Sequence, residues 1–237
     1  AMIILNLKGS ILQLKTINKI KMKVALIGAS GFVGTSILKE LLNRGHEVLA
    51  LVRHPEKLTV NDEKLTVKGI DVLDTEALTA AVKEQDAVIS AYNAGWTNPN
   101  LYDDFLAGSQ AIQKAVKAAA KPRLIVIGGA GSLEINGQQL VDGPDFPAEY
   151  KAGATAARDY LNTIRKEHEL NWTFFSPAIE MHPGIATGRT GKYRLGKDEP
   201  VFDQNNRSFL SVQDLAVVIA DELEHHKHPK QRFTAAY

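Results

Sequence analysis

The segment Gly28-Ala-Ser-Gly31-Phe-Val-Gly34 has the residue types and spacing to hold a phosphate group. It lies between a short apolar run, Val24–Ile27, and an amphipathic stretch that starts at Phe32, which is a strand–turn–helix context. Gly28 permits a tight turn, Gly31 lets the backbone approach a pyrophosphate, and Gly34 lets helix and strand pack closely, while the helix dipole attracts the anion. The predicted dinucleotide contacts here are Gly28, Ser30, Gly31, Phe32, Val33 and Gly34. The alternative is a tight turn without a ligand, because the glycine spacing differs from G-x-G-x-x-G.

The residue that follows the next predicted strand, Val48–Val52, indicates which dinucleotide is bound. An Asp or Glu at this point hydrogen-bonds the ribose 2′-hydroxyl, whereas an Arg accommodates a 2′-phosphate. Arg53 stands at the position of the acid, and Lys57 follows about one turn later. The sequence therefore predicts NADP(H) in preference to NAD(H). The alternative is that Arg53 is only a solvated charge at the edge of the sheet.

The ends of two later predicted strands supply further expected contacts with the dinucleotide. One predicted strand covers Leu65–Ile70 and the other Ala87–Ser90. The expected contacts are Asp71 and Val72 beside the adenine, and Ser90, Ala91 and Tyr92 along the path to the nicotinamide.

The order of the predicted elements favours an α/β fold with a doubly wound, mostly parallel sheet and helices on both faces, which is the Rossmann type. Uninterrupted apolar runs alternate with stretches of helical periodicity. Besides the strands already named, strands are predicted at Leu124–Ile127, Trp172–Phe175 and Gln231–Tyr237. Helices are predicted at Phe32–Leu42, Thr75–Lys83, Leu101–Ala120, Pro147–His168 and Val212–Glu224.

Residues 22–237 are expected to form a single NAD(P)-binding domain, with a small cap on the substrate side contributed by residues 177–237. That tail is rich in glycine and has strand-like pieces at Lys192–Leu195 and Ser208–Leu210, and Ser211 with Asp214 predicts a capped helix start. Residues 1–21 read as two similar apolar–polar pieces, typical of a small hairpin or a weak signal peptide. Our interpretation is an upstream extension outside the functional domain.

Composition excludes several classes of protein. The 237 residues include no Cys, so disulfides, thiolate nucleophiles and Cys-ligated metal centres are impossible. No apolar run approaches the ~18 residues of a membrane span. Residues 1–21 carry four lysines and no acid, so the rest of the chain has a mild net charge of −3. We therefore expect a cytoplasmic protein with a small-molecule substrate and neither nucleic acid nor membrane as partner; the sequence does not indicate an oligomeric state.

Four further motifs carry a resemblance to a known family. They are Gly128-Gly-Ala-Gly-Ser-Leu133, Asp145-Phe-Pro-Ala-Glu-Tyr-Lys151, Trp172-Thr-Phe-Phe-Ser-Pro-Ala178 and Thr190-Gly-Lys-Tyr-Arg194. With the glycine turn, they resemble atypical short-chain dehydrogenases/reductases, and among these the NADH-flavin reductase group, which is related to biliverdin reductase B and NmrA-like proteins. The resemblance covers about Met22 to Tyr237. It implies hydride transfer from NADPH to a flavin or another flat conjugated acceptor, with cofactor contacts at Gly128, Ser176, Pro177 and Ala178.

The proton relay of the usual dehydrogenases in this superfamily is incomplete here. They carry Tyr-x-x-x-Lys, in which the Lys lowers the pKa of the Tyr that protonates an alkoxide. Tyr150 is followed four places later by Ala154, and Lys151 points about 100° away from Tyr150 on a helix. Flavin tolerates this loss, because the anion formed by hydride transfer is a far weaker base than an alkoxide. The candidate catalytic hydrogen-bond donors are Ser132, Tyr150 and Lys151.

Several other polar and aromatic residues have both a functional and a purely structural interpretation. Trp96 and Tyr92 follow a predicted strand and are candidates to stack on a flat substrate, or they cover the core. His182 is a candidate for the substrate cleft or a turn residue. The histidines at 225, 226 and 228 lie at a helix end without an evident fourth ligand, so no metal site is predicted.

Two other functions stay open at this point. An NmrA-like regulatory protein would bind NADP and transfer no hydride, which suits the incomplete relay equally well. An NAD-dependent sugar-nucleotide epimerase or dehydratase is ranked last, because the tail after Pro177 is small for a sugar-nucleotide domain.

Overall fold

The computed structural model describes residues 20–237, so the interpretations of the first 21 residues concern a segment that lies almost wholly outside the described chain. The strands are β1 (Lys23–Ile27), β2 (Glu47–Val52), β3 (Leu65–Gly69), β4 (Ala87–Ser90), β5 (Arg123–Ile127), β6 (Glu134–Ile135), β7 (Gln138–Gln139), β8 (Trp172–Ser176), β9 (Arg194–Gly196) and β10 (Gln231–Ala236). The helices are α1 (Phe32–Arg44), α2 (Thr75–Val82), α3 (Leu101–Ala119), α4 (Ala148–Ile164) and α5 (Val212–His225).

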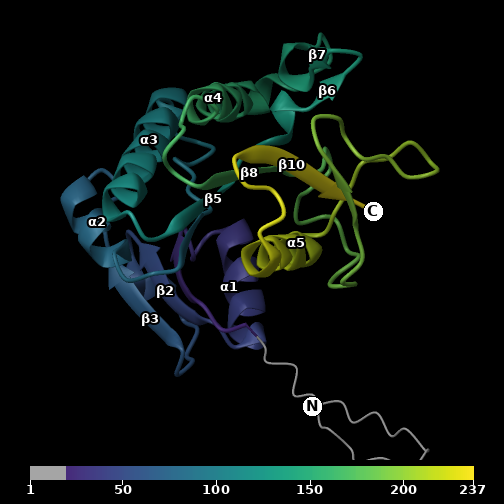
Figure 1. Ribbon diagram of the computed structural model, residues 1–237. Coiled ribbons are helices and arrows are strands. Elements are labelled where there is room, and N and C mark those ends of the chain that lie inside the picture. The colour runs from purple at the N-terminus through teal and green to yellow at the C-terminus, as the bar shows by residue number, and fades with distance from the viewer. Residues whose placement is uncertain (1–19) are drawn as a thin grey trace, which may run out of the picture.

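Within the described residues, eight strands form one sheet in the order β3-β2-β1-β4-β5-β8-β10-β9. Neighbouring strands from β3 to β10 are parallel, and only the edge strand β9 runs antiparallel to its neighbour. Helices α1 and α5 cover one face of the sheet, and α2, α3 and α4 cover the other (Figure 1). The doubly wound α/β fold expected from the sequence is confirmed.

The apolar strand β1 shows why the sheet is buried on both faces. Val24 and Leu26 belong to the core under α1 and α5, whereas Ala25 and Ile27 belong to the core under α2, α3 and α4. All four side chains are buried, because successive residues of a strand point to opposite faces. None of the helices within residues 20–237 combines the length and the apolar character that crossing a membrane requires.

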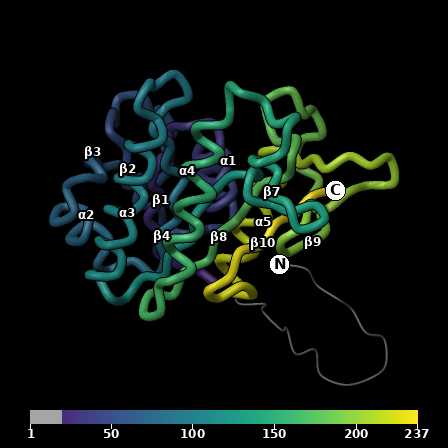
Figure 2. The backbone as a smooth tube through the Cα atoms, turned by 90° about the horizontal axis from the view of Figure 1, so that it is seen from above, coloured from purple at the N-terminus to yellow at the C-terminus, as the bar shows by residue number. Residues whose placement is uncertain are grey.

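The C-terminal tail divides into a core part and a covering part. Helix α5 packs against α1, and β10 pairs in parallel register with β8, so both belong to the central layers (Figure 2). Ser211 caps α5 as expected, with its hydroxyl accepting a hydrogen bond from the Asp214 N–H at 3.0 Å. The residues between β8 and α5 carry little regular structure, so the predicted strand at Ser208–Leu210 reduces to a single bridge between Phe209 and Glu180. The role of this segment as a substrate cap stays a prediction.

A network of charges joins α1 to α5 and to the segment before β9. The Arg44 guanidinium contacts Glu40 at 2.8 Å, and on α5 it contacts Asp221 at 2.7 Å and Glu224 at 3.0 Å. The buried Glu40 carboxylate also accepts two hydrogen bonds from Arg189, both at 2.8 Å. Hydrogen bonds from Arg189 and then Arg44 lower the pKa of Glu40 below its ordinary value, against the opposing effect of burial.

Replacing Glu40 by Gln is expected to lower the free energy of unfolding at pH 7 by about 2 kcal/mol, because charge-assisted hydrogen bonds are lost. A carboxyl whose pKa is lowered by folding stabilises the protein above its unfolded pKa, and this contribution is lost as pH falls through the folded pKa. The difference between Glu40→Gln and the parent is therefore expected to shrink as pH falls below about 4. Urea unfolding at several pH values measures it, with the exposed Glu63→Gln as control; a difference that is constant with pH contradicts the assignment.

Candidate functional site

The parallel register gathers the predicted cofactor contacts at one edge of the sheet. The glycine turn follows β1, Arg53 follows β2, Asp71 follows β3 and Ala91 follows β4, while Gly128 follows β5. Ser176 is the last residue of β8. In a doubly wound sheet, ligands bind outside the carboxyl ends of the strands, so the topology agrees with a single site along this edge.

The three glycines of the turn differ in how much room they leave for a Cβ atom. Gly28 has φ of +78°, and a Cβ there would lie 2.4 Å from the Ala91 carbonyl oxygen, so the backbone of the neighbouring strand end excludes a side chain. A Cβ on Gly34 would lie 1.9 Å from the Gly28 oxygen. A Cβ on Gly31, by contrast, would meet only ordinary contact at 3.4 Å. Packing therefore explains Gly28 and Gly34 but not Gly31, whose open side agrees with the approach of a ligand.

The start of α1 agrees with an anion at this position. Gly31 is the N-cap and supplies no side-chain cap, and no acidic residue lies in the first turn. Ser30, Gly31 and Phe32 are exposed, so the N–H groups of the first turn face an accessible surface. Unpaired helix N–H groups with a positive dipole end bind phosphate, and the fit of this turn to a dinucleotide pyrophosphate rests on that geometry.

Arg53, Asp71 and Tyr92 share one electrostatic neighbourhood. Burial raises the pKa of the Tyr92 hydroxyl, Asp104 and Asp71 raise it further, and Arg53 opposes them. Arg53 is exposed and has no acidic partner within the part of the chain that the structure describes, so its guanidinium is free to meet an anion. Val72 is buried, and the Asp71 carboxylate accepts the Leu73 N–H at 2.9 Å.

Tyr92 is a packing residue in this structure. Its ring stacks on Phe105 with the ring centroids 6.0 Å apart, and its hydroxyl donates to the Asp104 carbonyl oxygen at 3.0 Å. A Cβ on Gly108 would lie 2.4 Å from the same ring. Ser90 is buried, and the Ala91 N–H donates to the Ile27 carbonyl oxygen at 3.0 Å, which ties the end of β4 to the end of β1.

The ends of β5 and β8 are closely packed. A Cβ on Gly128 would lie 2.0 Å from the ring of Phe174, so this glycine is required by the core beneath it. Ser176, Pro177 and Ala178 are buried, whereas Ile179, the next residue, is 43% exposed. The polypeptide therefore emerges at the predicted nicotinamide end immediately after these three residues.

Ser132 is held by an arginine that sequence analysis did not single out. It is 2% exposed, and its Oγ accepts a hydrogen bond from Nη1 of Arg232 at 2.9 Å. The same Nη1 donates to Ser176 Oγ at 3.2 Å. Arg232 lies on β10, and its Nε and Nη2 donate to Asp198 at 3.1 and 2.9 Å. Burial lowers the pKa of Arg232, an effect that Asp198 opposes. The sequence signal for it was a charged residue within a predicted strand near the end of the chain.

Tyr150 and Lys151 lie at the start of α4, where both are exposed. The Tyr150 ring is 48% exposed and meets Trp96 edge to face, with centroids 5.7 Å apart; Trp96 itself is 59% exposed. The Trp96 ring rests against Gly153, where a Cβ would lie 2.8 Å from it. In the structure, Tyr150 therefore packs against an aromatic ring, whereas Ser132 hydrogen-bonds to Arg232.

The histidines have separate hydrogen-bond partners. His182 is exposed, and its Nδ1 accepts the Gly184 N–H at 3.1 Å. His226 contacts Asn171, and His228 contacts the buried Glu222. Ligand-type atoms of Asp221, Glu224 and His225 lie within 4.8 Å of one another, but Arg44 already pairs with both carboxylates.

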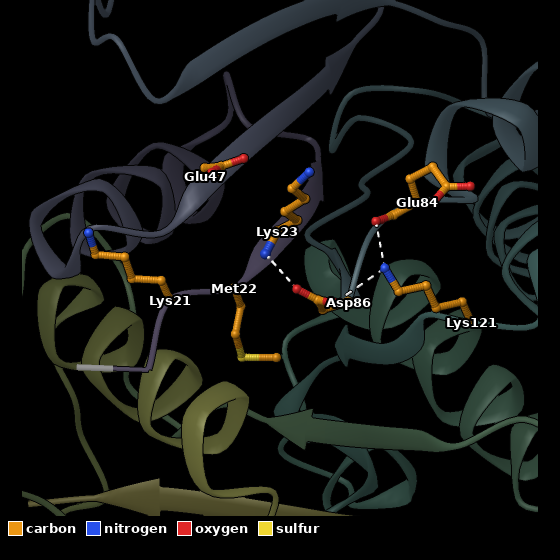
Figure 3. A pocket seen from close by; sticks show the side chains of 7 residues that line it. All are labelled: Lys21, Met22, Lys23, Glu47, Glu84, Asp86 and Lys121. Atoms are coloured by element: carbon orange, nitrogen blue, oxygen red, sulfur yellow. Dashed lines mark hydrogen bonds and ion pairs between the residues drawn. The ribbon is translucent and has the colours of Figure 1, made fainter. Parts of the chain in front are cut away.

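A depression of about 290 Å³ lies on the opposite edge of the sheet, at the amino ends of the strands (Figure 3). Among its lining residues, Asp86 is the centre of the polar contacts. The Lys23 N–H donates to Asp86 at 2.8 Å, and the Lys121 ammonium donates to the Glu84 carbonyl oxygen at 2.9 Å and lies 3.4 Å from Asp86. This position lies at the opposite edge from the carboxyl ends of the strands, where the predicted cofactor contacts are.

Comparison with known proteins agrees with this geometry. A family model described as NAD(P)H-binding matches residues 28–226. The protein YwnB of Bacillus subtilis is 38% identical over 216 residues, which are 90% of this chain and 97% of that protein. A structure from Bacteroides thetaiotaomicron, provisionally named an epimerase, is 46% identical with a TM-score of 0.83 and covers 91% of this chain and 96% of its own. A structure from Streptococcus pneumoniae, provisionally named an NADH-flavin reductase, is 34% identical with a TM-score of 0.78 and covers 91% and 99%.

These matches span nearly all the described residues and include a protein of the group that the sequence motifs resemble, so that resemblance is confirmed. The likeness therefore extends to one protein named after a reductase and to another named after an epimerase. With its glycine turn at the end of β1 and its predicted cofactor contacts along one edge of the sheet, the chain belongs to the NAD(P)H-binding family of Rossmann-fold proteins.

Proposed function

We propose that this protein is an NADPH-dependent reductase of flavins or of similarly flat conjugated acceptors. The observation that carries the proposal is the exposed pair Trp96 and Tyr150 at the edge that holds the cofactor turn. When bound, NADPH supplies a hydride from nicotinamide C4, so that the acceptor gains two electrons and the dinucleotide leaves oxidised. The residues of the chain then have to bind the acceptor ring, orient it and stabilise the charge it gains.

Several exposed apolar side chains follow the carboxyl ends of the strands. Among the described residues, Phe32, Leu73, Trp96, Tyr150 and Ile179 are large hydrophobic side chains that are at least 43% exposed and lie at or just beyond the carboxyl ends of strands or at the start of α4. Leaving such surface in water costs about 25 cal/mol per Å², and a concentration of it marks a binding surface. Trp96 and Tyr150 offer flat rings, which suits a flat conjugated acceptor.

The missing relay supports the same choice. Reduction of a simple carbonyl forms an alkoxide that needs an acid such as the Tyr of Tyr-x-x-x-Lys. Here position 154 is Ala, and the side chain of Ala154 is buried against Gly131. A flavin spreads the negative charge over its ring system, so hydrogen-bond donors and orientation suffice. This feature counts against an epimerase, despite the name of the Bacteroides relative.

The preference for NADPH over NADH rests on Arg53. It is exposed and lacks an acidic partner among residues 20–237. An arginine that forms a salt bridge within the protein would have to give it up to bind a 2′-phosphate, and Arg53 bears no such cost.

Reductase activity is tested by mixing protein and NADPH with and without FMN in a stopped-flow instrument and recording the NADPH absorbance band. We expect oxidation that depends on protein and saturates with FMN. Tight binding of NADPH with no oxidation by FMN, riboflavin or quinones would contradict the proposal and favour an NADP-sensing binding protein. Epimerase activity would instead leave the amount of reduced dinucleotide unchanged over complete turnovers.

The proposal that Trp96 and Tyr150 bind the acceptor ring is tested through the two tryptophans of the chain. Trp172 is buried and Trp96 is exposed. In Trp172→Phe, Trp96 is the sole tryptophan, and we expect FMN to quench its fluorescence saturably when NADP⁺ is present. Trp96→Ala is expected to raise the KM for FMN roughly tenfold, equal to about 1.4 kcal/mol. Ile20→Ala is the matched control, because Ile20 is also exposed but precedes β1. An unchanged KM for FMN in Trp96→Ala would show that Trp96 does not bind the acceptor.

Arg53→Glu is expected to raise the Kd for NADPH by about tenfold or more, since it removes a charge-assisted contact and adds repulsion. The Kd for NADH serves as an internal control and should change little, because NADH lacks the 2′-phosphate. Isothermal titration with both dinucleotides measures the two values. Equal losses for both would mean that Arg53 acts on some other part of the cofactor.

The glycine turn provides a matched pair of variants. Gly34→Ala is expected to destabilise the fold by about 2 kcal/mol or more, because its Cβ would overlap the Gly28 oxygen. Gly31→Ala has room for its Cβ and should keep the melting temperature of the parent, yet weaken NADPH binding roughly tenfold. Thermal melts and titrations separate the two effects. Parental NADPH affinity in Gly31→Ala would show that the dinucleotide does not approach this residue.

A further inference from the structure

Arg232 is a buried cation beneath the carboxyl edge of the sheet. Its side chain is 1% exposed, and it stands opposite Phe174 in the register of β10 and β8. Its guanidinium makes five hydrogen bonds to three residues: to Ser132 Oγ at 2.9 Å, to the Ser132 carbonyl oxygen at 3.2 Å, to Ser176 Oγ at 3.2 Å, and to Asp198 at 2.9 and 3.1 Å. It therefore joins the ends of β5 and β8 to the segment that follows β9.

The two serines accept hydrogen bonds from Arg232 but donate none within the described residues. Each hydroxyl has one hydrogen to donate, and both side chains are almost fully buried, with Ser176 at 0% and Ser132 at 2% exposure. A buried donor without an acceptor costs about 1–3 kcal/mol. The guanidinium takes up acceptor capacity on each oxygen, so each hydrogen must point elsewhere. An acceptor on a bound molecule would remove this cost.

The position of Ser132 indicates what that acceptor is. Ser132 follows β5, whose neighbours in the sheet are β4 and β8, and these strands lead to Trp96 and to Ile179. It therefore lies at the part of the edge where the proposed function places the acceptor ring. A flavin or quinone carries carbonyl oxygens, and hydride transfer to its ring makes them more negative. Hydrogen-bond donors held ready for a developing negative charge lower the barrier to reaction.

We infer that Arg232 is a positioning residue that directs the Ser132 hydroxyl to donate a hydrogen bond to a carbonyl oxygen of the reduced acceptor. This inference rests on the proposed reductase function. The positive charge also polarises the Ser132 O–H bond and makes it a stronger donor. No covalent bond is formed by Ser132 or Arg232, and neither gives up a proton. Their contribution is to hold a donor at the site of growing negative charge.

Arginine suits this position better than lysine. Its planar fork presents several N–H donors at fixed angles, so one group holds two hydroxyl oxygens, a carbonyl oxygen and a carboxylate at once, whereas an ammonium has three donors on a flexible stem. Asp198 balances the charge and is itself tied in place, because its carbonyl oxygen accepts the Glu134 N–H at 2.8 Å.

The test is a double-mutant cycle of Arg232→Lys and Ser132→Ala in the full-length protein. With saturating NADPH and FMN as acceptor, each single variant is expected to lower kcat about tenfold, and the double variant to lose little beyond Ser132→Ala. Losses that multiply would overturn the inference, because Arg232 would then act independently of Ser132. The Kd for NADPH and the melting temperature are recorded for each variant, so that loss of folding is separated from loss of function.

Two further variants keep the result interpretable. Asp198→Asn weakens the hydrogen bonds to the guanidinium but leaves Arg232 in place. We expect a loss of kcat that is smaller than in Arg232→Lys and that again disappears in the Ser132→Ala background. Arg165→Met is the matched control, because Arg165 also contacts Asp198 but is exposed and makes no hydrogen bond to Ser132 in the described chain. Parental kcat is expected for Arg165→Met. If Arg165→Met lowers kcat as much as Asp198→Asn does, the loss comes from the disturbance of Asp198 alone and gives no support to a role of Arg232.

A binding measurement separates this inference from the proposed function. Fluorescence titration of FMN into the protein with NADP⁺ present involves no hydride transfer. Ser132→Ala and Arg232→Lys are each expected to weaken FMN binding about threefold, without a further loss when combined. If the parent protein oxidises no NADPH but shows this coupling, the reductase function fails and the Arg232–Ser132 donor stands. If the parent turns over and neither kcat nor binding shows coupling, the inference fails and the reductase function stands.

Discussion

The arrangement of the site depends on a backbone contact at the end of β1, where no side chain fits. Gly28 lies against the carbonyl of Ala91 at the end of β4, and Gly34 in the first turn of α1 lies against the carbonyl of Gly28. These contacts fix the direction in which α1 leaves the sheet. The positive end of α1 therefore lies at the edge formed by the carboxyl ends of the parallel strands. Gly31, which packing does not require, lies open between these two constraints.

Three arginines show how their surroundings decide what a charge does. Arg44 is neutralised by carboxylates on α1 and α5, so it joins helices. Arg232 is buried and shares its donors between Asp198 and two serine hydroxyls, so it joins the ends of β5 and β8 to the segment that follows β9. Arg53 is exposed and has no acidic partner in residues 20–237, so it is the one of the three that can meet an external anion at little cost.

The aromatic residues near the site divide in the same way. The Tyr92 ring packs against Phe105 and Gly108, and its hydroxyl donates a hydrogen bond to a backbone carbonyl. Tyr92 therefore supports the loop that follows β4. Trp96 and Tyr150 pack against each other yet leave much of their rings in water. The absence of the Lys of Tyr-x-x-x-Lys and the presence of flat apolar surface are consistent with each other, because an acceptor that delocalises charge needs placement more than protonation.

The sequence by itself determined the features that depend on near neighbours in the chain. The glycine spacing, the apolar runs and the helical periodicity predicted the turn, the strands and the helices, because burial of a strand or of one helix face leaves a pattern in residues close together in the chain. Arg53 was identifiable for the same reason, since the role proposed for it depends on its place directly after β2. Only the tertiary structure decided the partners of Ser132, Tyr150 and Tyr92. Arg232 lies 100 residues beyond Ser132 and reaches it because β10 adds to the sheet beside β8, a pairing set by the packing of the whole domain.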